Sequence, residues 1–158
     1  MMKEKQPGSK QCFVCGLENP VGLKIEFYET GPGEVQSEIT FPDHYQGYPG
    51  VTHGGIIATV LDETGGRALM EDPRHFMVTA QLNVRYRKPV PTETPLLAKG
   101  WAGTRKGKVS KAHSEIQTLD GEVLAEAELI LVDMPENNYD QISLEEMGWR
   151  VYPDEEEK

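Results

Sequence analysis

The chain has 158 residues, enough for one domain with a hydrophobic core, and 37% of them are apolar. Its formal net charge of −10 and its pI near 4.9 argue against a surface for nucleic acids or anionic membranes. No apolar run is long enough to span a bilayer, and residues 1–10 lack the apolar core of a signal peptide. We therefore expect a cytoplasmic protein with no nucleic-acid partner and no membrane partner.

A CxxC motif, Cys12-Phe13-Val14-Cys15-Gly16, lies near the start of the chain. Structural zinc usually takes four ligands, so the motif is only half a zinc site, and the βαβ context of a redox motif is absent. We therefore predict a tight turn with small buried thiols and no metal. This turn belongs to an N-terminal segment, residues 1–22, ahead of the main domain.

Alternating apolar and polar residues are typical of half-buried strands. The pattern predicts six of them, over residues 23–28, 34–41, 78–86, 96–104, 109–119 and 122–132. Asp120-Gly121 predicts the hairpin turn between the last two strands. The main domain is therefore expected to cover residues 23–134.

The stretch from Gly50 to Gly66 predicts a loop that enters a buried helix. Apolar residues at helical spacing give the helix one buried face, and Pro73 stops it near Met70. Gly65 and Gly66 each cost roughly 1 kcal/mol in a helix relative to Ala, so another group must approach the backbone there or the helix must bend. One helix cannot cover both faces of such a sheet. We therefore predict an α+β fold in which an antiparallel sheet wraps around one long central helix, with edges left for a partner chain.

Two features of this helix suggest a catalytic site. Gly54 and Gly55 leave its first turn without side chains, so backbone N–H groups and the positive end of the helix dipole suit a developing oxyanion. Asp62 has mostly apolar or small neighbours, which favours a nucleophile or general base over a solvated carboxylate. Glu63 lies about 100° around the helix from Asp62 and is the alternative carboxylate.

Several motifs occur together: Cys12-Phe13-Val14-Cys15-Gly16, Asn19-Pro20, Gly22-Leu23, His53-Gly54-Gly55 with Asp62, and residues 79–86. In these residues the chain, from about Cys12 to Met134, resembles the hotdog-fold acyl-CoA thioesterases of the PaaI-like superfamily. The resemblance implies hydrolysis of an acyl-CoA thioester by a homodimer or homotetramer with active sites at the dimer interface. It implies no metal and no cofactor, since coenzyme A is part of the substrate.

The resemblance also implies roles for individual residues. The implied catalytic set is Asp62, Gly54, His53, Gly55, Thr79 and Gln46. The N–H of Gly54, or of its neighbour Gly55, polarises the thioester carbonyl, and Asp62 is the nucleophile or general base. His53 and Gln46 lie near the thioester, and Thr79 helps to place the water.

Helix geometry adds a condition to this scheme. Gly54 and Asp62 are eight residues apart, which is roughly 12 Å along a helix axis. A short Asp side chain cannot span that gap to a carbonyl held at its own helix start. If both residues act on one thioester, they must come from different subunits, and the protein must be an obligate dimer with two equivalent sites.

Coenzyme A phosphates need cations in this acidic chain. The candidates are Arg105, Lys106 and Lys108 in a basic turn, and Arg87 and Lys88 after the preceding strand. Solvated basic turns are the simpler interpretation. A hydratase or dehydratase acting on acyl-CoA or acyl carrier protein, or an acyl-CoA-binding protein without turnover, remains an alternative function.

Residues 135–158 are expected to form a tail outside the main domain. Ser143 and Glu146 suggest a capping box for a short helix closed by Gly148. Three apolar or aromatic residues would dock this helix: Trp149, Val151 and Tyr152. The tail is expected to finish in a solvated acidic end, 154–157.

Overall fold

The computed structural model describes residues 3–135 and 143–154. Its elements are β1 (Glu4–Lys5), β2 (Tyr28–Gly31), β3 (Glu34–Ile39), the 3-10 turn η1 (Asp43–Tyr45), β4 (Gln46–Tyr48), β5 (Val51–Thr52), α1 (Gly54–Ala68), β6 (Met77–Tyr86), β7 (Leu96–Lys106), β8 (Val109–Thr118), β9 (Val123–Asp133) and α3 (Leu144–Met147). Seven strands form one antiparallel sheet in the order β1-β2-β3-β7-β8-β9-β6, and β4 pairs with β5 in a small hairpin.

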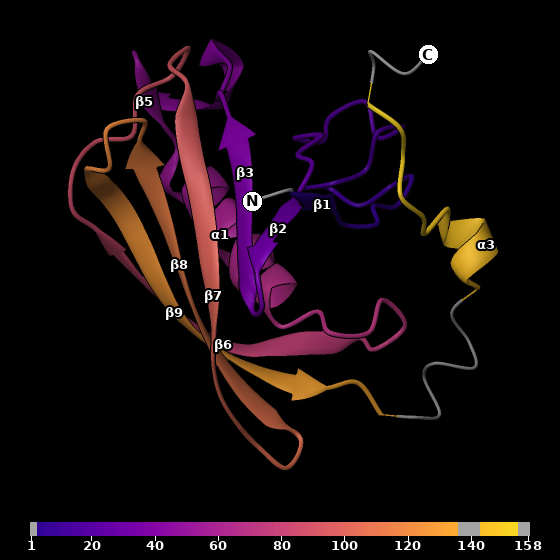
Figure 1. Ribbon diagram of the computed structural model, residues 1–158. Helices are drawn as coiled ribbons and strands as arrows, with labels where there is room; N and C mark the ends of the chain where they lie inside the picture. The colour runs from indigo at the N-terminus through magenta and orange to yellow at the C-terminus, as the bar shows by residue number, and fades with distance from the viewer. Residues whose placement is uncertain (1–2, 136–142, 155–158) are drawn as a thin grey trace.

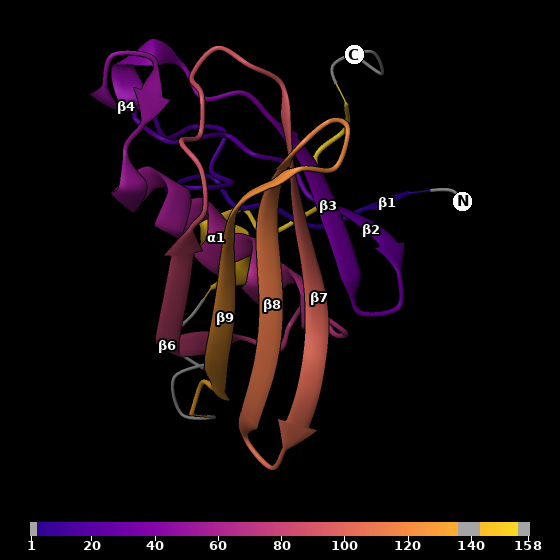
Figure 2. The same cartoon turned by 90° about the vertical axis from the view of Figure 1, so that its left-hand side faces the viewer.

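The long sheet curves around α1, which lies against its inner face (Figures 1 and 2). The buried face of α1 includes Ile57, Val60 and Leu61, at the spacing expected from the sequence. This arrangement confirms the predicted α+β architecture of a sheet wrapped around one main helix. Within the described ranges, no helix combines the length and the apolar character needed to cross a membrane.

Two glycines allow α1 to lie close to the sheet. A Cβ on Gly65 would lie 2.5 Å from a terminal methyl of Leu129 on β9, and a Cβ on Gly100 of β7 would lie 2.5 Å from the carbonyl oxygen of Thr64. Gly65 therefore has the close neighbour predicted from its cost in a helix. A Cβ on Gly66 would make only an ordinary contact, at 3.5 Å from Leu131, so Gly66 does not share this explanation.

The predicted strand over residues 23–28 is wrong. Only Tyr28 lies in a strand, and Lys24 has a positive φ of 55°, which interrupts an extended backbone. The N–H groups of Leu23 and Ile25 donate to the carbonyls of Phe13 and Val14, both at 2.8 Å. The apolar side chains in this stretch are therefore buried against the N-terminal segment, which produces a strand-like pattern without a strand.

β6 is an edge strand whose outer face is open. It pairs only with β9 within the described residues, and the exposed fractions of its Val78 and Tyr86 side chains are 47% and 52%. Val78 lies on the face that points away from α1, whereas Tyr86 shares the inner face with Leu82 and Val84, which pack against the core. A ten-residue strand with one free edge and an exposed apolar surface is suited to pairing with another chain.

The described part of the tail packs beside the N-terminal segment (Figure 1). The Ser143 hydroxyl accepts a hydrogen bond from the Glu146 N–H, and Gly148 ends α3 with a φ of 67°, as the capping box predicts. Trp149 donates to the Pro73 carbonyl at 2.7 Å. Asp154 was expected to be solvated but contacts Lys5 at 2.7 Å and the Tyr28 hydroxyl at 3.0 Å. The rest of the predicted acidic end, 155–157, lies outside the described residues.

Candidate active site

His53 caps the N-terminus of α1 with its side chain. Its backbone is extended, and its Nδ1 accepts a hydrogen bond from the Gly55 N–H at 2.9 Å. Because Nδ1 accepts, the neutral ring carries its proton on Nε2. The exposed His53 ring can therefore donate one hydrogen bond outward.

The N–H groups of the first helical turn are used unequally. The Gly55 N–H is taken by His53 Nδ1, and the N–H groups of Ile56 and Ile57 donate to the His53 carbonyl at 3.0 and 3.1 Å. Within residues 3–135 and 143–154, the Gly54 N–H has no acceptor. The Gly54 carbonyl accepts from the Tyr86 hydroxyl at 2.7 Å, which ties the helix start to β6. Gly54, rather than Gly55, therefore offers the backbone donor for an oxyanion.

A hollow of about 440 Å³ opens at this end of the helix. It is lined by Tyr48, His53, Gly54 and Tyr86, and by the two cationic residues Arg87 and Lys88. Arg87 forms a two-pronged ion pair with Glu126 at 3.0 and 2.8 Å, and Lys88 pairs with Glu122. The Gly54 N–H, the His53 imidazole and the two cations therefore line the same hollow. This is the combination of groups that could bind a thioester linked to phosphates.

Asp62 lies in the second half of α1, with a different set of neighbours. Its Oδ1 accepts a hydrogen bond from the Thr79 hydroxyl of β6 at 2.7 Å, so the structure brings these two predicted residues together. Glu63 turns away from Thr79, and its Oε1 accepts from the Arg67 Nε at 2.8 Å. Asp62 and Glu63 therefore have separate partners, and Thr79 positions only the first of them.

A second hollow, of about 410 Å³, holds Asp62 and Thr79 together with Glu63, Cys12 and Cys15. It shares no lining residue with the hollow at the helix start. The distance along α1 between Gly54 and Asp62 remains roughly 12 Å, as helix geometry requires. One chain therefore carries two half-sites: a donor end and a carboxylate end.

The remaining candidates lie outside both half-sites. Gln46 is exposed on β4, where it pairs with Thr52, and does not line the hollow at the helix start. Arg105 is held by Asp133, with contacts of 3.0 and 2.6 Å. Lys106, the last residue of β7, and Lys108, in the turn to β8, are both exposed. Of the five predicted cations, Arg87 and Lys88 are the two that the structure brings to the Gly54 hollow.

Arg67 is a buried cation that the sequence did not single out. Its side chain is 3% exposed, donates to Glu63 and to the Pro7 carbonyl, and lies over the rings of Phe27 and Trp149 at 4.9 and 5.2 Å. In the sequence, only its spacing of four residues from Glu63 indicated an ion pair along the helix. Tyr86, which holds the helix start, carried no comparable signal.

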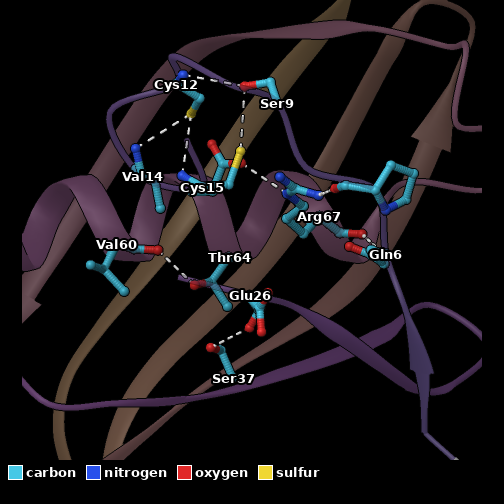
Figure 3. Close-up of polar contacts among 12 residues, drawn as sticks. Gln6, Ser9, Cys12, Val14, Cys15, Glu26, Ser37, Val60, Thr64 and Arg67 are labelled. Carbon is cyan, nitrogen blue, oxygen red and sulfur yellow. Dashed lines mark hydrogen bonds and ion pairs between the residues drawn. The ribbon is translucent and has the colours of Figure 1, made fainter. Parts of the chain in front are cut away.

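The CxxC motif forms a turn whose thiols face α1 (Figure 3). Cys15 is buried, Cys12 is half-buried, and the Gly16 N–H closes the turn by donating to the Cys12 carbonyl at 2.8 Å. A hydrogen bond from the Cys12 thiol lowers the pKa of Cys15 to about 6, and the positive charge of Arg67 also lowers it. The sequence predicted this turn and its buried thiols, but not its position beside Glu63 and Arg67.

Comparison with known proteins shows which family this chain resembles. A family model described as Thioesterase superfamily matches residues 49–125. Acyl-coenzyme A thioesterase THEM4 of Rattus norvegicus is 30% identical over 123 residues, which cover 77% of this chain and 53% of that protein. The chain thus spans about half the length of the rat and mouse relatives that it matches.

Solved structures share the fold. A thioesterase superfamily protein superposes with a TM-score of 0.71 and 31% identity, over 78% of this chain and 63% of that chain. A Streptococcus mutans protein solved bound to acetyl CoA gives a TM-score of 0.63 at 20% identity, over 70% of this chain and 88% of that chain. The chain therefore carries a thioesterase-superfamily domain with the hotdog fold.

Proposed function

We propose that this protein hydrolyses acyl-CoA thioesters at a site that two subunits share. The observation that carries the proposal is the division of α1 into two half-sites, with a free Gly54 N–H in one hollow and the Asp62–Thr79 pair in another. The 30% identity to an acyl-coenzyme A thioesterase supports the choice of reaction. The free edge of β6 and its exposed apolar side chains support pairing of two chains.

At each site, one subunit supplies the electrophilic half. The thioester carbonyl oxygen accepts from the Gly54 N–H, where the helix dipole stabilises the negative charge that develops during attack. The Nε2–H of His53 provides a second donor beside it. We place Gln46 at the edge of this half-site, because it lies on the adjacent β4–β5 hairpin and does not line the hollow.

The other subunit supplies Asp62. As a general base, Asp62 takes a proton from water while the water oxygen attacks the carbonyl carbon; the C–S bond then breaks and the coenzyme A thiolate takes up the proton. As a nucleophile, its carboxylate attacks the carbonyl, and the C–S bond breaks to expel the coenzyme A thiolate; water then hydrolyses the resulting anhydride to the free acid and restores Asp62. In both routes the Thr79 hydroxyl occupies Oδ1 and leaves the other oxygen to react.

Coenzyme A needs cationic contacts at the mouth of the site. Arg87 and Lys88 are suited to this role because they line the Gly54 hollow, while each also pairs with a carboxylate outside its lining, Glu126 or Glu122. Lys106 and Lys108, together with Arg105, form a second cationic group in the β7–β8 turn. We assign the first group to the phosphates of the same subunit's substrate and keep the second as an alternative.

Complementation between subunits tests the shared site. Asp62→Asn and Gly54→Pro chains, each with its own affinity tag, are co-expressed, and the mixed dimers are purified through both tags. Each mixed dimer has one site with both functional residues and one with neither, so we expect about half of the wild-type turnover from two inactive parents. Mixed dimers as inactive as either parent would contradict the shared site.

Free-thiol release from a panel of short, long-chain and aryl acyl-CoAs tests the reaction itself. Turnover on part of the panel, lost in Asp62→Asn, is the expected result. Hydration of an enoyl-CoA without thiol release would instead identify a hydratase. Binding of acyl-CoA without either reaction would identify a binding protein.

A further inference from the structure

The CxxC turn has the hydrogen bonds of a metal-binding turn. The backbone N–H groups of Val14 and Cys15 point at the Cys12 sulfur, at 3.4 and 3.5 Å, and the Cys12 N–H donates to the Ser9 hydroxyl at 3.2 Å (Figure 3). Donors aimed at a sulfur stabilise its thiolate form, which is the form that binds metals. The Ser9 hydroxyl also lies 3.8 Å from the Cys15 sulfur. The turn thus gathers both sulfurs and fixes them.

A carboxylate from α1 completes a group of three ligands. The two sulfurs and a carboxylate oxygen of Glu63 all lie within 4.8 Å of one another. We propose that Cys12, Cys15 and Glu63 bind a zinc ion that fastens the N-terminal segment to α1. This site is separate from the proposed thioester chemistry, which uses the neighbouring Asp62.

The distances suit zinc after a small contraction. With Zn–S bonds of about 2.3 Å and a Zn–O bond of about 2.0 Å, a tetrahedral ion holds two sulfurs about 3.8 Å apart and a sulfur and an oxygen about 3.5 Å apart, so no pair of ligand atoms has to close by more than about 1.3 Å. The contact between Glu63 and Arg67 uses Oε1 and leaves Oε2 for the metal. The hollow beside these atoms has room for a water molecule as the fourth ligand.

The surrounding charges favour a divalent ion. Two thiolates and one carboxylate around Zn²⁺ leave one negative charge, which the buried Arg67 balances through its contact with Glu63. Without a metal, the hydrogen bond with Cys15, burial and the charge of Glu63 raise the pKa of the Cys12 thiol, so zinc binding displaces its proton. Paired thiolates select zinc over the hard cations Mg²⁺ and Ca²⁺, which prefer oxygen ligands.

Metal content of the full chain is the first measurement. The protein is purified under reducing conditions, stripped with a chelator and titrated with Zn²⁺ against a chromophoric competitor. We expect one Zn²⁺ per chain and protection of both thiols from a thiol reagent. With Co²⁺ in place of zinc, we expect thiolate-to-metal charge-transfer absorption and the intense visible bands of a tetrahedral site.

Variants identify the ligands. Replacing both cysteines by serine should abolish the Co²⁺ charge-transfer bands. Glu63→Gln keeps the turn and both thiols, and should weaken zinc binding by at least about 10-fold. Asp62→Asn, which alters the next carboxylate in the same hollow, is the matched control and should keep the wild-type zinc affinity. Circular dichroism establishes that each variant is folded.

Two results would overturn the proposal. A reduced, folded wild-type chain that retains no zinc and gives no Co²⁺ charge-transfer band has no such site. If Glu63→Gln binds zinc as tightly as the wild type, Glu63 is not a ligand and the ion does not connect the turn to α1. The metal would then be bound by cysteines alone, for example at a site shared between two chains. Neither result depends on thioester turnover, so this test and the test of the proposed reaction can fail separately.

Discussion

The two half-sites on α1 are held in opposite ways. At the helix start, the donor is a backbone group fixed by local geometry, with the His53 cap and the Tyr86 hydroxyl as its supports. Half a helix away, Asp62 is a side chain whose position depends on Thr79 of β6, the strand that follows the helix. The donor itself is therefore set by local sequence and only supported by β6, whereas the position of the carboxylate depends on its contact with β6. Substitutions should separate the two ends.

The largest expected effect is at the carboxylate end. Asp62→Asn keeps the size of the side chain and its hydrogen bond from Thr79, but removes the base or nucleophile. We expect kcat to fall by about 10²–10⁴-fold with little change in the binding of coenzyme A. Steady-state thiol release measures the fall, and Glu71→Gln, an exposed carboxylate just past the helix, is the control. A loss of less than 10-fold would point to Glu63 instead.

The backbone donor can be removed without unfolding the helix. Gly54 is the first helical residue, where proline is tolerated, and His53 already has the extended backbone that a following proline requires. Gly54→Pro deletes the N–H, so we expect kcat to fall by about 10²–10³-fold. Gly54→Ala keeps the N–H and adds a Cβ that would lie 3.4 Å from the Tyr86 hydroxyl, so it is the matched control. Equal losses in both variants would mean that crowding, rather than the donor, matters.

The two functions proposed for His53 can be told apart. His53→Ala removes the cap and should lower the free energy of unfolding by about 0.5–2 kcal/mol, whereas Asn, a good capping residue, should restore most of it. Neither replacement restores the imidazole donor, so both should reduce kcat by about 10-fold if that donor contacts the thioester. Thermal or urea unfolding and thiol release are measured on the same samples. Full activity in His53→Asn would leave His53 a cap only.

The smallest expected effect lies outside both half-sites. Burial lowers the pKa of His113, but hydrogen bonds to Glu115 and Glu128 outweigh it and raise the pKa above its usual value. Since the folded pKa is the higher one, this stabilisation is complete below about pH 6.5 and is lost as the pH rises through the folded pKa. We expect a change below about 1 kcal/mol, because the pair is partly solvated. The free energy of unfolding, measured with urea across this pH range, should fall with rising pH in the wild type, and this fall should be absent in His113→Gln.

The sequence supports local inferences better than tertiary ones. The helix and its glycine start could be predicted because apolar spacing and paired glycines are local signals, whereas the catalytic role of Asp62 stays a prediction. The contacts made by Arg67 and Tyr86 could not, because they depend on which strand lies beside the helix. The stretch 23–28 was mistaken for a strand because packing against the CxxC turn alternates its burial as a sheet would. The basic turn containing Arg105 was equally visible in sequence, but its pairing with Asp133 was not.

The open face of β6 makes catalysis sensitive to dilution. If each site needs Gly54 from one chain and Asp62 from another, a lone chain has no complete site, and specific activity must fall once the protein is diluted below the dissociation constant of the dimer. The exposed side chains of β6, among them Val78 and Tyr86, then set the working concentration range, although each of these two also lines one of the hollows. Any other molecule that covers β6 would prevent dimerisation and so abolish turnover, while leaving both half-sites chemically intact.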